Sequence, residues 1–207
     1  MPPSLLVLTG VVSVQVGAGL AARLFTQIPP AAVTALRLWT AAALMAVAGA
    51  RPLRQSLAGL VRRRSWRDAA VVAAFGLTLA VMNYSIYQAF ARIPLGIAVT
   101  IEFLGPLAVA VVTSRRLIDL LWVTLAGAGV ALLTGAGNLA GGGHGIDLVG
   151  LAFALLAGAA WAAYIILSRA TGRRFPGASG LTIAMLVAAV VIVPVGVTAG
   201  RGALLRP

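Results

Sequence analysis

One carboxylate interrupts a strongly apolar stretch of the sequence, NYSIYQAFARIPLGIAVTIEFLGP, which runs from residue 83 to residue 106. Glu102 is followed four residues later by Pro106, and a proline frees a backbone carbonyl in a helix because it has no N–H to donate. A charge at the centre of a membrane helix costs about 2.5 to 3.5 kcal/mol, so such groups usually face a partner or a water-filled cavity. A buried carboxyl can carry a proton or hold an ammonium group.

The same stretch carries a group of polar side chains before Glu102. Asn83 and Tyr87 are four residues apart, as are Tyr84 and Gln88, and at 100° per residue the four cover about 140° of a helix. This spacing predicts a helix with one polar face. The two tyrosines fit a binding role and a structural role equally well.

Two further polar residues, Gln15 and Arg37, are predicted to lie at a similar depth in the membrane. With a rise of about 1.5 Å per residue, Glu102 and Asn83 lie roughly 12 Å below the outer surface, and Gln15 and Arg37 lie roughly 13 and 9 Å below it. Four helices therefore bring polar groups to one level. For Gln15, hydrogen bonding between helices is the preferred interpretation. Arg37 is expected either to be a counter-ion for Glu102 or to extend toward the membrane surface.

The composition indicates an integral membrane protein. Of the 207 residues, 61% are hydrophobic and 10% are charged, with a mean hydropathy of +1.03, whereas about a quarter of an ordinary soluble domain is charged. The net charge of +12 does not indicate a nucleic-acid partner, because all 16 basic residues are arginines and most lie in clusters between apolar stretches. Cysteine is absent and the single histidine, His144, lies in a glycine-rich stretch. The sequence therefore predicts no disulfide, metal site or cofactor.

Seven windows have the roughly twenty apolar residues that a transmembrane helix needs. They lie near residues 5–24, 31–50, 69–91, 94–113, 117–136, 148–168 and 180–199. Six, two and three arginines fall in the second, fourth and sixth connecting loops, against four on the opposite side. Cytoplasmic loops carry the excess of positive charge, so the N-terminus is predicted to be cytoplasmic. The expected fold is an all-α polytopic membrane helix bundle of about seven spans.

Four stretches resemble one group of membrane transporters. They are SVQVGAGLAARLF, VTALRLWTAAAL, NYSIYQAFARIPLGIAVTIEFLGPLAVAV and GAAWAAYIILSRATGRR, and the resemblance runs from about residue 13 to residue 195. The group is the homoserine/threonine exporter type of EamA transporter in the drug/metabolite transporter superfamily. Glu102 and Pro106 occupy its E-x-x-x-P in the fourth helix, and Trp161 and Tyr164 occupy aromatic positions of its sixth helix.

The resemblance implies ten helices in two five-helix repeats of inverted topology, with the substrate site near the midplane. Residues 1–136 correspond to the first repeat and residues 137–207 to an incomplete second repeat, so we expect a truncated form that lacks the last three helices. The implied function is export of small metabolites, first of all amino acids such as threonine and homoserine, across the bacterial inner membrane, with the proton gradient as a plausible energy source. The expected substrate-binding residues are Glu102, Asn83, Tyr84, Tyr87, Gln88, Arg37, Gln15, Trp161 and Tyr164.

Alternatives come from two other classes of function. An intramembrane enzyme needs a nucleophile with a base, paired aspartates or a metal. Asp68, Asp119 and Asp147 lie at the ends of predicted spans, so Glu102 is the one carboxylate in a span interior, and we expect no enzyme. A non-transporting membrane scaffold, with a homodimer, would depend on the small-residue row Gly127, Ala131 and Gly135, for which packing within one chain is preferred. The expected partners are the lipid bilayer and a small-molecule substrate.

The second connection contains the basic stretch RPLRQSLAGLVRRRSWRD. An interfacial segment that binds anionic lipid is one interpretation of this stretch. A role as topology determinant alone is the preferred one.

Overall fold

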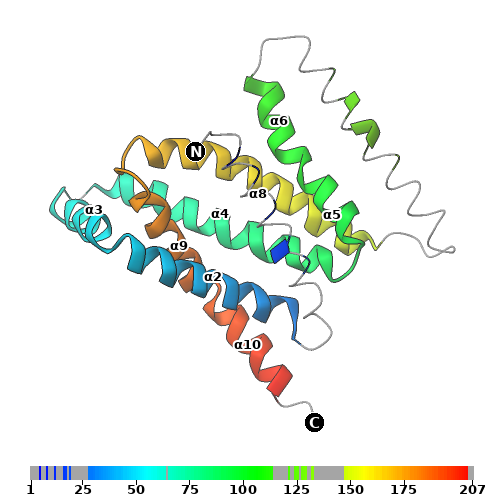
Figure 1. Ribbon diagram of the computed structural model, residues 1–207, viewed down its shortest axis with the longest axis horizontal. Coiled ribbons are helices and arrows are strands. Elements are labelled where there is room, and N and C mark those ends of the chain that lie inside the picture. The colour runs from blue at the N-terminus through cyan, green and yellow to red at the C-terminus, as the bar shows by residue number, and fades with distance from the viewer. Residues whose placement is uncertain are drawn as a thin grey trace.

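The computed structural model describes residues 28–63, 65–113 and 147–204, together with isolated positions between residues 5 and 19 and between residues 121 and 132. Within these ranges every secondary-structure element is a helix (Figure 1). In chain order the helices are α2 (Pro30–Ala48), α3 (Ala50–Arg63), α4 (Trp66–Phe90), α5 (Leu95–Glu102), α6 (Leu104–Thr113), α8 (Leu148–Gly172), α9 (Ser179–Val191) and α10 (Val193–Leu204). The prediction of an all-α polytopic membrane bundle is confirmed.

The described helices match five of the seven expected spans. Four candidate spans, Pro30–Ala48, Trp66–Phe90, Leu95–Thr113 and Leu148–Gly172, are long and apolar enough to cross a membrane. Helices α9 and α10 together form a fifth candidate, which is bent by 43°. The first and fifth expected spans, 5–24 and 117–136, lie mostly outside the described residues.

Two of the spans break shortly before a proline. Helix α5 ends at Glu102 and α6 begins at Leu104, because Pro106 has no N–H to bond the Glu102 carbonyl four residues earlier. Helix α9 likewise ends at Val191, ahead of Pro194. The span expected over residues 94–113 is present as Leu95–Thr113, and Phe103 divides it into α5 and α6.

Helix α4 is the centre of the packing. It packs most extensively against α8 and next against α9, while α2 lies against α9 and α10 (Figure 1). Two apolar clusters fill these contacts. Buried members of the first include Leu38, Phe75, Leu79, Ile183 and Ala188, and those of the second include Tyr87, Ala98, Ile101, Ala154 and Ala157.

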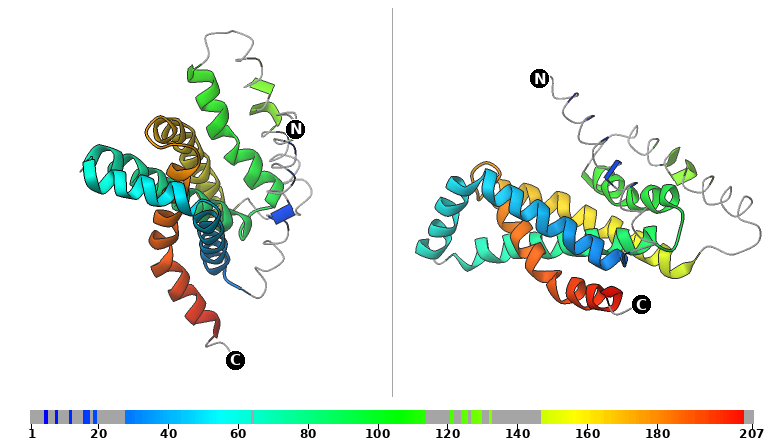
Figure 2. Two further views of the ribbon diagram at one scale, coloured as in Figure 1. Left: turned by 60° about the vertical axis from the view of Figure 1, so that its left-hand side comes forward. Right: turned by 60° about the horizontal axis from the view of Figure 1, so that its bottom comes forward.

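The segment between α2 and α4 is a helix, α3, where the sequence led us to expect a loop. Figure 2 shows α3 running across one end of the bundle, from the end of α2 to the start of α4. Leu53 and Ser56 are buried, and the Ser56 hydroxyl donates a hydrogen bond to the Ser179 hydroxyl of α9 at 2.9 Å. These contacts fix α3 to the bundle.

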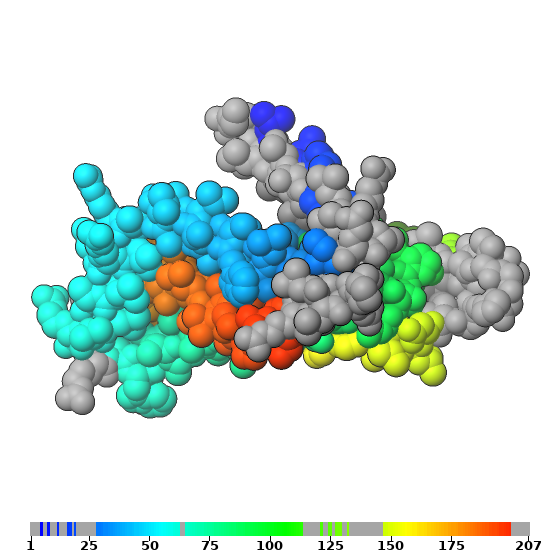
Figure 3. Space-filling view, turned by 90° about the horizontal axis from the view of Figure 1, so that it is seen from below, coloured from blue at the N-terminus to red at the C-terminus, as the bar shows by residue number. Residues whose placement is uncertain are grey.

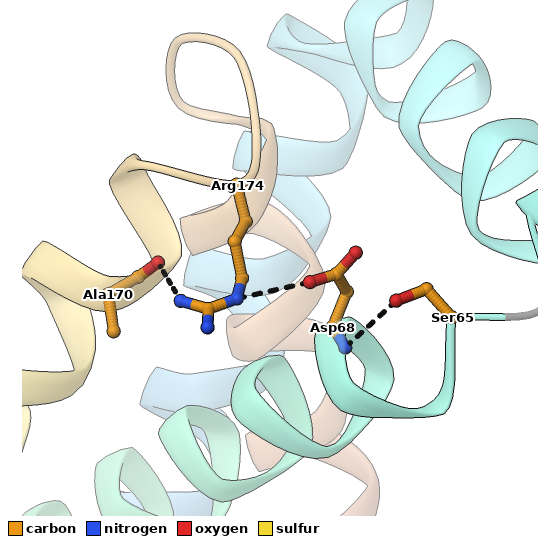
Figure 4. Close-up of polar contacts among 4 residues, drawn as sticks. All are labelled: Ser65, Asp68, Ala170 and Arg174. Atoms are coloured by element: carbon orange, nitrogen blue, oxygen red, sulfur yellow. Dashed lines mark hydrogen bonds and ion pairs between the residues drawn. The ribbon is translucent and has the colours of Figure 1, made fainter.

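An ion pair joins the start of α4 to the turn after α8, at the same end of the molecule. The Asp68 carboxylate lies 3.0 Å from Nε of Arg174, whose Nη1 donates to the Ala170 carbonyl at 2.8 Å (Figure 4). The Asp68 N–H donates to Ser65 Oγ at 3.4 Å and caps α4. A hollow of about 210 Å³ beside this pair is lined by polar groups that include Ser56. The second and sixth connections therefore meet at one end of the bundle.

Candidate functional site

The position of Glu102 follows from the helix break and from a close contact with α8. Its backbone carbonyl, which Pro106 cannot bond, faces Gly158, where a Cβ would lie only 3.0 Å from that oxygen. A Cβ on Gly105 would overlap the Gly158 carbonyl. Ala98, one turn before Glu102, is fully buried in the cluster that contains Ala154. Helix α8 is therefore the helix that approaches closely at Ala98 and Gly105.

The Glu102 side chain is the one charged side chain among the buried residues that the structure describes. It is 9% exposed, and within the described ranges no hydrogen bond or ion pair reaches its carboxylate. Arg37 is near enough to act electrostatically on this carboxyl, although the two do not form an ion pair. The carboxylate is therefore held inside the bundle, with a guanidinium nearby.

Arg37 is held by a tyrosine of α4. Its Nη1 donates to the Tyr87 hydroxyl at 2.6 Å, and its guanidinium carbon lies 5.6 Å from the centroid of the same ring. Tyr87 is only 1% exposed. The structure therefore turns Arg37 inward from α2 toward α4, and Tyr87 links the two helices.

The other polar residues of α4 do not meet at this site. Asn83 donates through Nδ2 to the Leu79 carbonyl of its own helix at 2.9 Å. The Gln88 Oε1 accepts from Nη1 of Arg92 at 2.7 Å. Tyr84 packs edge-on against Phe153 of α8, with ring centroids 6.1 Å apart. The expected polar face is thus divided among several partners.

The aromatic residues of α8 lie at two different places. Trp161 contacts Phe103 edge-on with centroids 4.9 Å apart, one residue beyond Glu102. Tyr164 packs on Phe75 at 5.3 Å in the first apolar cluster. Trp161 therefore borders the Glu102 region, and Tyr164 does not. Gln15 lies outside the described residues, as do Ala131 and Gly135 of the small-residue row.

Sequence reasoning did not identify two residues that shape this region. Arg92 binds Gln88 and lies 5.2 Å from the Phe153 ring centroid, and its position four residues after Gln88 is the signal that could have revealed it. Gly158 lies in a run of small residues in α8, but nothing in that run identifies Gly105 as its partner.

Comparison with known proteins gives the site a context. Over 202 residues the chain is 39% identical to the threonine/homoserine exporter RhtA of Salmonella typhimurium (strain SL1344), covering 98% of this chain and 64% of the exporter. Over 194 residues it is 39% identical to the exporter of the same name from Escherichia coli (strain K12), covering 94% of this chain and 62% of the exporter. The chain is a homologue of these exporters. The resemblance noted in the sequence is confirmed.

The chain matches only part of the length of these exporters. The chain spans between 62% and 64% of the length of these relatives. No protein-family model and no solved structure matches it. Homology to exporters, together with the apolar helices, makes the chain a multi-pass membrane protein related to transporters.

Proposed function

We propose that the chain exports small amino acids of the threonine and homoserine type, with Glu102 and Arg37 as the centre of the substrate site. The observation that carries the proposal is the buried Glu102 carboxylate, which has no protein partner among the described residues and lies within electrostatic reach of Arg37. The names of the homologous exporters support the substrate class.

The chemistry of the two groups fits a zwitterion. A carboxylate in a low-dielectric site attracts an ammonium group, and a guanidinium binds a carboxylate with two parallel hydrogen bonds. Tyr87 already accepts a hydrogen bond from Arg37, so the guanidinium is held in place before a substrate arrives. Trp161 and Phe103 form an apolar border beside Glu102. A small polar amino acid would place one charged group on each side of this site.

We also propose how export is driven, how the chain is oriented in the membrane and how its repeats are arranged. Glu102 can also carry a proton, which would couple export to the proton gradient. The arginine-rich end that contains α3 faces the cytoplasm, so the N-terminus is cytoplasmic and the membrane is the bacterial inner membrane. Residues 1–136 form one repeat, and residues 137–207 begin a second repeat of inverted topology.

The test replaces a carboxylate by its isosteric amide at two positions. Glu102→Gln should abolish threonine and homoserine efflux from cells and should weaken threonine binding to the purified chain by at least about tenfold, because an amide leaves the ammonium without a counter-charge. Asp147→Asn is the matched control. Asp147 is exposed and caps α8 through a 2.8 Å bond from the Val149 N–H, and asparagine caps a helix equally well.

The binding measurement is needed because the chain spans less than two thirds of its relatives. It gives a result on the chain as it stands, whatever the rate of efflux. Equal threonine affinity in the Glu102→Gln and Asp147→Asn proteins would remove Glu102 from the site.

A further inference from the structure

Helix α3 presents an apolar edge beside a cationic edge. Leu57 and Val61 are 41% and 78% exposed, one turn apart. Arg51, Arg54 and Arg62 are also exposed, and α3 contains no acidic residue. At 100° per residue, Arg54 lies about 20° from Val61 and about 60° from Leu57 around the helix axis. Positive charge and exposed apolar surface therefore adjoin each other along the helix.

The start of α4 continues this pattern. Trp66 is 72% exposed, and the guanidinium carbon of Arg67 lies 5.5 Å from its ring centroid. Tryptophan is enriched where a bilayer meets water, because its ring is apolar and its N–H is polar. An exposed tryptophan beside an arginine is typical of that boundary.

The placement of α3 determines what can cover its apolar edge. The spans run along the bundle, and α3 crosses their end (Figure 2), where it forms one extremity of the molecule (Figure 3). Spans cross a membrane along its normal, so α3 runs close to the membrane plane. Leu53 and Ser56 fix its opposite side to the bundle, and the Ser56 hydroxyl is bonded to Ser179. The helix cannot turn Leu57 and Val61 into the protein.

We propose that α3 is an interfacial helix that binds anionic phospholipid headgroups at this end of the molecule. Arg51, Arg54 and Arg62 bind the phosphate groups, and Leu57 and Val61 insert among the upper acyl chains. A guanidinium matches a phosphate through paired N–H···O bonds, and amphipathic helices of this kind lie in the headgroup layer. An acidic protein partner would satisfy the arginines but would leave the apolar edge uncovered.

This role differs from that of a topology determinant. Topology depends on how many arginines lie on one side of the membrane, whereas lipid binding depends on where they lie around α3. The proposal is also independent of transport, because no residue of the Glu102 site takes part in it.

The first test locates the apolar edge, and the absence of cysteine from the chain makes single labels simple. The variant Val61→Cys is labelled with an environment-sensitive fluorophore and reconstituted in vesicles of equal parts phosphatidylcholine and phosphatidylglycerol. We expect quenching by lipids that carry a nitroxide near the headgroup, and protection from aqueous iodide. The control is Ala58→Cys, which is exposed on the arginine side of the same helix and should remain open to iodide. Equal iodide quenching at both positions would overturn the interfacial placement.

The second test measures headgroup preference with the label at position 61. Nitroxide-labelled phosphatidylglycerol should quench more strongly than labelled phosphatidylcholine, and Arg54→Gln or Arg62→Gln should each lower this preference by about fivefold. Arg173→Gln is the matched control, since Arg173 is exposed at the same end of the molecule but outside α3. In the labelled protein that keeps all its arginines, a higher salt concentration should weaken the preference for phosphatidylglycerol without exposing the label to water.

Two results would overturn the proposal. Equal quenching by both lipids in the protein with all its arginines would show that α3 does not select anionic headgroups. Loss of the preference on addition of inorganic phosphate, but not of an equal ionic strength of chloride, would assign the arginines to a soluble phosphate compound.

Discussion

The contact between Arg37 and Tyr87 is a charged hydrogen bond inside the helix bundle. The Tyr87 hydroxyl accepts from Arg37 at 2.6 Å, and its ring faces the guanidinium. A guanidinium inside a membrane protein needs such acceptors, because an N–H group without a hydrogen-bond partner is costly there. Tyr87 thus stabilises the charge that we place opposite Glu102.

Replacing Tyr87 by phenylalanine removes the hydroxyl and keeps the ring, so it measures the contribution of the hydroxyl alone. Tyr87→Phe is expected to lower the free energy of unfolding by about 1 to 2 kcal/mol, because the hydrogen bond to Arg37 is lost inside the bundle. Threonine affinity should fall with it, since Arg37 loses its fixed position. Thermal unfolding and binding in detergent measure the two effects.

Tyr84→Phe is the control for that experiment. The Tyr84 ring packs on Phe153, and among the described residues its hydroxyl has no hydrogen-bond partner. Phenylalanine should therefore be tolerated at position 84. Similar losses in both variants would show that the Arg37 bond is not what Tyr87 contributes.

At the scale of elements, a glycine pair sets how closely two helices approach. Gly105 of α6 and Gly158 of α8 meet backbone to backbone, and the Glu102 carbonyl lies against Gly158. Small residues at such contacts let membrane helices gain dispersion energy and weak polar contacts. The same contact fixes the end of α5 and therefore the position of the carboxylate.

An added methyl group tests this contact. Gly105→Ala should lower the unfolding free energy by about 1 to 3 kcal/mol, because its Cβ would overlap the Gly158 carbonyl and force the helices apart. Gly96→Ala is the control in the same span, since nothing lies within 4 Å of a Cβ there. Thermal unfolding in one detergent compares the two. Equal melting temperatures would contradict the close approach.

The sequence predicted the spans better than their partners. Hydropathy and the thickness of a bilayer place helices well, and small residues such as Gly105 indicate a close contact, but periodicity carries no information on which helix lies opposite. The stripe from Asn83 to Gln88 was predicted as one polar face, yet the Asn83 amide donates to the Leu79 carbonyl of its own helix. The arginine-rich stretch between the second and third apolar windows was predicted as a connecting loop, yet most of it forms α3.

At the scale of the whole molecule, the bundle separates two kinds of chemistry. One end holds α3, the Asp68–Arg174 ion pair and most of the described arginines, and its chemistry is that of a charged membrane surface. Glu102 and Arg37 lie within the bundle, where Arg37 donates to Tyr87 and acts electrostatically on Glu102. The names of the homologous exporters supply the substrate class that we propose for this site, and the chain covers 62% to 64% of their length.

The central claim is that Glu102 lines a polar site that water and substrate can reach from within the membrane. The direct measurement is the rate at which a membrane-impermeant, water-soluble thiol reagent modifies Glu102→Cys, with Leu77→Cys as the lipid-facing control, since Leu77 is 51% exposed near the middle of α4. The chain has no other cysteine. We predict that the cysteine at position 102 reacts at least about tenfold faster than that at position 77, because thiolate formation needs water. Equal, slow reaction at both positions in a correctly inserted protein would contradict the claim.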